Sequence, residues 1–159
     1  MELPLFDQVD DLVRAMTPEQ LGTLKTRVHR RGIKIWFETE KAPPLHYEAQ
    51  VLNRRHVDGT EGGALEIGLH AEHGDEAAND AIVQALSDNS VQWRRSLGSE
   101  AEIGSFFGAE GWRRVSEAWI EPDLDDPETA LAIAARVVDY IDALEPHVRR
   151  LDPEDTPRA

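Results

Sequence analysis

Two segments near the middle of the chain alternate apolar and polar residues: LHYEAQVLN at 45–53 and ALEIGLHAEH at 64–73. A period of two places every second side chain on the same face of a β-strand. An Arg- and Gly-rich loop joins the segments, so they predict an antiparallel hairpin. The hairpin buries one face when its apolar positions share a side, which requires this register between the strands: Tyr47, Ala49 and Val51 with Leu65, Ile67 and Leu69.

Helical spacing precedes the hairpin. Apolar residues recur every three or four positions over 5–16, which predicts a short amphipathic helix. Thr17-Pro18-Glu19-Gln20 has the pattern of a capping box, so we expect a second helix from Pro18 to a glycine stop at Gly32. The β-branched and aromatic residues of IKIWFETE at 33–40 then indicate a strand.

After the hairpin, Asp75 is a suitable N-cap for a helix that continues in bent form to Gly98. Three glycines weaken any long element over 99–111, where we expect a helical turn and a loop. WRRVSEAWI at 112–120 predicts another strand. The last helix starts at Asp126 and bends or ends near Pro146. The positions expected to be buried in these helices are Ala78, Ile82, Ala85, Leu86, Val91, Trp93, Leu97, Leu131, Ala134, Val137, Val138, Ile141 and Leu144.

These elements predict the α+β class, with a single antiparallel sheet of about four to five strands packed against N-terminal helices and a long C-terminal helix. The length of 159 residues fits one domain, which we place at 1–151. The acidic, proline-bearing tail at 152–159 is expected to be disordered.

Composition restricts the functional classes. The absence of cysteine removes disulfides and thiolate chemistry and fits a reducing cytoplasm. Acidic residues at the start of the chain and the lack of a long apolar run argue against a secretory signal or a membrane span. The net charge of −14 repels phosphate backbones, which argues against a nucleic-acid partner.

Five arginine doublets, at 30–31, 54–55, 94–95, 113–114 and 149–150, interrupt the acidic composition. Arginines of this kind pair with nearby acids at the ends of elements, or they converge into a phosphate-binding patch. We favour pairing with acids.

The polar side of the hairpin gathers the residues that could carry chemistry. Imidazole and carboxylate groups on adjacent strands can share a cation or form an acid–base pair. The segment His70-Ala71-Glu72-His73 offers a ligand pair only if the strand turns at Ala71, because positions 70 and 73 otherwise face opposite sides. The candidate residues of this polar face are Trp36, Glu38, His46, Glu48, Gln50, Glu66 and His70, with Gly68 and Glu72 beside them.

Two interpretations of the polar face remain open. Antiparallel sheets commonly expose one face to water, and a chain rich in glutamate can fill that face without any function. We favour this interpretation, and with it no metal and no cofactor. The alternative is a metal site formed by His46, Glu48, Glu66 and His70.

Several scattered residues of the region 33–150 resemble a small bacterial domain of unknown function that often follows nuclease-like domains. The resemblance implies no catalytic residue here, because the nuclease part has no counterpart in this chain. The order of elements also resembles that of acidic, dimeric chaperones of secretion systems. The residues that carry the first resemblance are Asn79, Trp93, Leu97, Gly98, Trp112, Trp119, Tyr140 and Pro146.

The sequence lacks the common catalytic signatures, so our leading hypothesis is a non-catalytic binding or regulatory module of the bacterial cytoplasm. We expect a protein partner in a chaperone-like role, or self-association as a dimer through the C-terminal helix. The alternative is a metal-assisted, nuclease-like hydrolase that uses the four polar residues of the candidate metal site.

Overall fold

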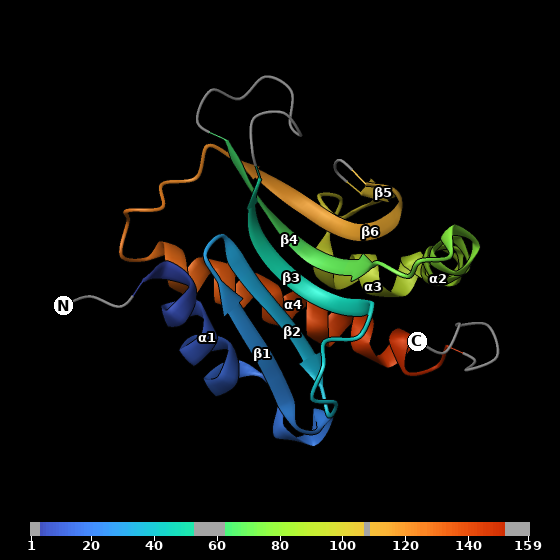
Figure 1. Cartoon of the computed structure of the whole chain (residues 1–159), viewed down its shortest axis with the longest axis horizontal. Helices are drawn as coiled ribbons and strands as arrows, with labels where there is room; N and C mark the ends of the chain where they lie inside the picture. The colour runs from blue at the N-terminus through green and yellow to red at the C-terminus, as the bar shows by residue number, and fades with distance from the viewer. Residues whose placement is uncertain (1–3, 53–62, 107–108, 152–159) are drawn as a thin grey trace.

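The structure is a computed structural model that describes residues 4–52, 63–106 and 109–151 (Figure 1). Most of the expected loop between the two hairpin strands and the expected acidic tail lie outside these residues. The α+β class is confirmed, and the antiparallel sheet has six strands in the order β1-β2-β3-β4-β6-β5, one more than the predicted upper number. The strands are β1 (Leu24–His29), β2 (Gly32–Phe37), β3 (Leu45–Leu52), β4 (Ala64–Ala71), β5 (Glu102–Phe106) and β6 (Ala109–Ile120).

The central hairpin of β3 and β4 has the predicted register. Tyr47 pairs with Leu69, and Ala49 pairs with Ile67. All four side chains are buried in the hydrophobic core. The apolar positions therefore share one face, and the alternating polar positions are directed to the other face.

Helices cover the apolar face of the sheet, and Ile82 and Trp93 of two later helices belong to the same core. α1 (Leu5–Met16) and α4 (Thr129–Val148) pack against each other, α1 lies over β1 and β2, and α4 lies over β3 and β4 (Figure 1). The Tyr47 hydroxyl donates a 2.8 Å hydrogen bond to Glu145 of α4, which fixes the helix over the hairpin. Leu131 is an exception to the predicted stripe, since it is 52% exposed. Among the described residues, no helix combines the length and apolarity needed to cross a membrane.

The predicted second helix is wrong. A 3-10 turn, η1 (Glu19–Leu21), is followed by strand β1, which turns through Arg30 and Arg31 into β2. Leu24 and Val28 are four residues apart, a spacing that a helix and a strand share. Thr26 distinguishes the two, because its hydroxyl donates to Asp10 of α1. Its side chain therefore lies on the same helix-covered face as Leu24 and Val28, which is the period of two of a strand.

The segment 99–111 also differs from its prediction. It contains the edge strand β5 and the start of β6 instead of a helical turn and a loop. Ile103 pairs with Val115 of β6, so cross-strand pairing outweighs the weak propensity of the glycines. Gly104 lies inside this strand, where an added Cβ would have no neighbour within 4 Å.

The helical region after the hairpin is divided in two. α2 (Glu76–Asp88) begins at the predicted cap, where the Asp75 carboxylate accepts from the Ala77 amide. The helix stops at Asn89, and α3 (Ser90–Leu97) follows. The change of direction leaves Val91 71% exposed, so its predicted burial is wrong, whereas Trp93 is buried as expected.

The backbones of the neighbouring strands β4 and β6 approach closely where Gly68 pairs with Ser116. A Cβ built on Gly68 would lie 2.3 Å from the Val115 carbonyl oxygen and 2.5 Å from Cα of Ser116. Gly68 also has a φ of 157°. Only glycine fits here without displacing β6, because any side chain would overlap its backbone.

Candidate metal centre

The polar face of the hairpin is buried, so the expectation of a solvent-exposed face is wrong. His46 is 3% exposed, Glu48 is 4% exposed, and Glu66 and His70 are fully buried. Burying carboxylates without compensation is costly, so ionised groups at this depth require partners. Here imidazoles and carboxylates supply partners to one another.

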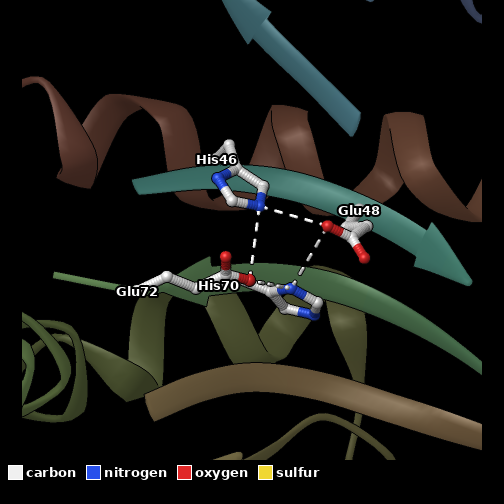
Figure 2. A group of neighbouring side chains, drawn as sticks. All are labelled: His46, Glu48, His70 and Glu72. Atoms are coloured by element: carbon white, nitrogen blue, oxygen red, sulfur yellow. Dashed lines mark hydrogen bonds and ion pairs between the residues drawn. The ribbon is translucent and has the colours of Figure 1, made fainter. Parts of the chain in front are cut away.

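Four side-chain atoms converge between the strands (Figure 2). His46 Nε2 lies 3.2 Å from Glu48 Oε1 and 3.5 Å from Glu72 Oε2. His70 Nδ1 lies 3.7 Å from the same Glu48 atom and 3.1 Å from the same Glu72 atom. Nitrogen and oxygen atoms therefore alternate around a four-membered ring of contacts, and all four atoms lie within 4.8 Å of one another. We call His46, Glu48, His70 and Glu72 the His–Glu cluster.

The cluster arises from two His-x-Glu segments on antiparallel strands. His46 on β3 and His70 on β4 are direct cross-strand partners. Because the strands run in opposite directions, Glu48 lies on one side of the histidine pair and Glu72 on the other. Glu72 follows the end of β4, where its amide donates to the Pro44 carbonyl. That bond continues the ladder past Ala71 and keeps Glu72 on the polar side.

The second nitrogen of each histidine has its own acceptor. His46 Nδ1 lies 2.8 Å from the Pro43 carbonyl oxygen. His70 Nε2 lies 2.9 and 2.7 Å from the two carboxylate oxygens of Glu66. Neither acceptor carries a proton to donate when Glu66 is ionised, so both outer nitrogens are the protonated ones. In the neutral rings this leaves the inner nitrogens as lone-pair donors toward the cluster.

Without a metal ion, the cluster favours protonated histidines beside ionised glutamates. Burial opposes the charge on His70, but the Glu66 charge and the hydrogen bonds to Glu66 and Glu72 outweigh it and raise the pKa of His70 to about 10. Burial also opposes the charge on His46, yet hydrogen bonds to Glu48 and Glu72 raise its pKa above the usual value. The pKa of Glu72 lies well below its ordinary range because, against burial, the two histidines stabilise its charge.

A phenylalanine ring and a lysine lie beside the cluster. The Phe106 ring from β5 contacts the His70 ring edge-on, with centroids 4.6 Å apart. Trp112 from β6 packs against Phe106 in turn, at 5.4 Å. Lys34 Nζ lies 4.0 Å from the other carboxylate oxygen of Glu72, whose side chain is 11% exposed. Glu72 is thus the most accessible member of the cluster.

The structure brings together most of the candidate residues that the sequence indicated, but the fourth ligand differs. Glu66 binds the outer nitrogen of His70, Nε2, and Glu72 takes the fourth ligand position instead. Gln50 donates to Glu66 at 2.9 Å. Trp36 is buried, and its indole donates to the Thr39 carbonyl.

Two sequence candidates lie apart from the cluster. Glu38 has a positive φ of 71°, and its carboxylate accepts from the Thr23 amide. His73 is not a member of the His–Glu cluster, and its backbone amide donates to the Asn79 side chain. Sequence reasoning placed Glu72 on the polar face but omitted it from the ligand set; the repeated His-x-Glu spacing was the signal that could have included it.

The spacing of the cluster suits a small transition-metal ion. Neighbouring ligands of a tetrahedral zinc ion, with bonds of about 2.0–2.1 Å, lie about 3.3 Å apart. The four consecutive contacts of the cluster, at 3.1 to 3.7 Å, bracket this value. The diagonal pairs lie within 4.8 Å and would have to close as an ion bound. Two imidazoles and two carboxylates are ordinary zinc ligands.

A second buried polar network lies on the helix-covered side. Glu117 of β6 accepts hydrogen bonds from Arg136 and Tyr140 of α4, at 2.9 and 2.8 Å, and from the Trp119 indole at 2.8 Å. Each carboxylate oxygen has a donor, and Arg136 supplies a compensating charge. This network links β6 to α4, and its saturation with partners indicates a structural role.

Three arginines of the described doublets form ion pairs with nearby acids. Arg113 binds Glu76 and Asp80 of α2, Arg114 binds Glu102, and Arg149 binds Glu145. The doublet at 54–55 lies outside the described residues. Pairing with acids therefore accounts for these three arginines.

Comparison of the chain with protein-family models, with curated proteins and with solved structures finds no match. The interpretation of the site thus depends on its own chemistry.

Proposed function

We propose that the protein is a non-catalytic metal-binding module that holds one divalent transition-metal ion, zinc foremost, in the His–Glu cluster. The observation that carries the proposal is the convergence of four ligand atoms of suitable type within 4.8 Å of one another. The strongly acidic chain, with a net charge of −14, also attracts cations at long range.

A closed ligand set supports binding over catalysis. Catalytic zinc sites usually retain a position for water or substrate, whereas structural sites fill all four positions with protein atoms. The cluster supplies four protein ligands, and the side chains of His46, Glu48 and His70 are at most 5% exposed. These features favour the non-catalytic alternative over the metal-assisted hydrolase.

The ligand types also define the expected selectivity. Imidazole suits zinc, copper, nickel and iron, whereas magnesium and calcium prefer sites made of oxygen. Two imidazoles among four ligands therefore favour zinc and these other transition metals over magnesium and calcium. A site that binds only the latter two ions would not fit the proposal.

Isothermal titration of chelator-treated protein tests the proposal. Zinc is expected to bind with one-to-one stoichiometry and a Kd in the micromolar range or tighter, and magnesium to give no heat of binding. His70→Gln and Glu48→Gln should each weaken zinc binding by at least about tenfold, because each removes a ligand. Flat zinc titrations of the folded wild-type protein would contradict the proposal.

Matched variants separate the cluster from nonspecific binding. His73→Gln changes a histidine three positions from His70 that is not part of the cluster. Glu40→Gln changes an exposed glutamate on the connection between β2 and β3. Both variants are expected to bind zinc as the wild-type protein does.

The bacterial and cytoplasmic setting, the protein partner, the dimer and the resemblance to the bacterial domain stay predictions. They are compatible with a metal-binding module, in which the ion would stabilise the sheet or regulate association. Light scattering with and without zinc would test the association.

A further inference from the structure

We infer that Glu66 is a positioning residue for the metal centre: it holds His70 in the orientation and tautomer that presents Nδ1 to the ion. This inference rests on the proposed function. Its basis is the bidentate contact between His70 Nε2 and both carboxylate oxygens of Glu66, at 2.9 and 2.7 Å, in a fully buried pair.

The two histidines offer different nitrogens although their sequence settings are alike. Each belongs to a His-x-Glu segment, and the two residues are paired across the strands. His46 nevertheless presents Nε2, and His70 presents Nδ1. The difference follows the outer acceptors, because the Pro43 carbonyl lies at Nδ1 of His46 and Glu66 lies at Nε2 of His70.

Glu66 is itself held in place by donors. Gln50 donates to its Oε1 atom at 2.9 Å, and Ser116 of β6 adds a further hydrogen bond. The Ser116 hydroxyl in turn accepts from Arg114 at 2.9 Å. Both carboxylate oxygens of Glu66 lie within hydrogen-bond distance of His70 Nε2, so Glu66 accepts from this nitrogen and keeps the ring proton on it.

The arrangement has a clear chemical effect. A carboxylate behind a ligating imidazole fixes the ring and makes its other nitrogen a better electron-pair donor, and loss of such a partner typically weakens metal binding by about 10–100-fold. Glu66 therefore acts on the ion through His70. The sequence had placed it among the ligands themselves.

The test uses the full chain with ¹⁵N-labelled histidine, loaded with ¹¹³Cd²⁺ as an NMR-active substitute for zinc. In the wild-type protein, cadmium is expected to couple to Nδ1 of His70 and to Nε2 of His46. Glu66→Leu removes the acceptor, so the Nδ1 coupling should be lost or reduced and zinc affinity should fall by about 10–100-fold. Glu66→Gln keeps an acceptor oxygen, so the Nδ1 coupling should persist while affinity falls by less than in the leucine variant.

Several outcomes separate the inference from a merely structural role. Glu102→Gln alters a partner of Arg114 near the surface and should change neither the couplings nor the affinity. If Glu66→Leu does not fold, the zinc affinity of Glu66→Gln tests the inference. Unchanged affinity in Glu66→Gln, or the wild-type Nδ1 coupling and affinity in folded Glu66→Leu, would overturn the inference. A wild-type protein that binds neither cadmium nor zinc would instead overturn the proposed function.

Discussion

His46 and His70 are direct cross-strand partners in the central hairpin, and their rings meet edge to face with centroids 5.7 Å apart. Each ring has a carboxylate two residues further along the chain, and the two carboxylates flank the pair from opposite sides. This single pairing converts two separate His-x-Glu segments into one cluster. A slip of one residue in the register would direct one histidine to the helix-covered face and destroy the cluster.

Protons and a metal ion should compete for the cluster. The pKa of His70 is raised to about 10 from an ordinary 6.5, so in the metal-free protein its charged form contributes stability that is complete below about pH 6.5 and lost as the pH rises through about 10. A metal ion requires the neutral imidazole, so zinc should stabilise the protein more at pH 8 than at pH 6.

Thermal unfolding with and without zinc at these two pH values measures this competition. At a free zinc concentration of about 100 times the Kd, stabilisation should reach about 2.7 kcal/mol. His70→Gln is the variant in which the pH-dependent part should shrink, and His73→Gln should retain it. A zinc-induced shift in Tm that is equal at both pH values would speak against the competition.

The contact between Gly68 and β6 predicts a large effect of one added methyl group. Gly68→Ala should lower the free energy of unfolding by about 1–3 kcal/mol or prevent folding, because the new Cβ overlaps the Ser116 backbone. Gly104→Ala is the matched control, since its Cβ has no neighbour within 4 Å. Urea denaturation in the presence of chelator would compare them, and equal stabilities would refute the close approach.

The network around Glu117 predicts a stability effect without a metal effect. Glu117→Leu leaves Arg136 without its buried partner and should destabilise the protein by about 3–5 kcal/mol. Zinc affinity of the folded fraction should stay as in the wild-type protein, because Glu117 faces α4 rather than the cluster. The exposed Glu110→Gln serves as the control. A loss of zinc binding in folded Glu117→Leu would show that the two networks are coupled.

The hairpin and its polar face could be predicted from the sequence, because period-two alternation directly reports which side chains share a face. The identity of Gln50 and Glu66 as neighbours follows from the same register. The sequence placed Glu72 on this face, but its role as a ligand depends on the bond from its amide to the Pro44 carbonyl beyond the end of β4, which the alternation does not report.

Other features required knowledge of tertiary contacts. Leu24 and Val28 satisfy helical and strand periods alike, and only the bond from Thr26 to α1 separates the two. The burial of the polar face depends on neighbours such as Phe106 of β5. The glycines of this segment predicted a turn and a loop instead of a strand. The choice between an exposed face and a buried cluster therefore could not be made from the alternation alone.

The most direct test of the account is the location of the ion itself. Crystals of the zinc-loaded protein, measured on both sides of the zinc absorption edge, should show one anomalous peak bonded to His46 Nε2, His70 Nδ1 and the carboxylates of Glu48 and Glu72, at about 2.0–2.2 Å. An ion bound elsewhere, or no peak at the cluster in crystals that contain stoichiometric zinc, would contradict it.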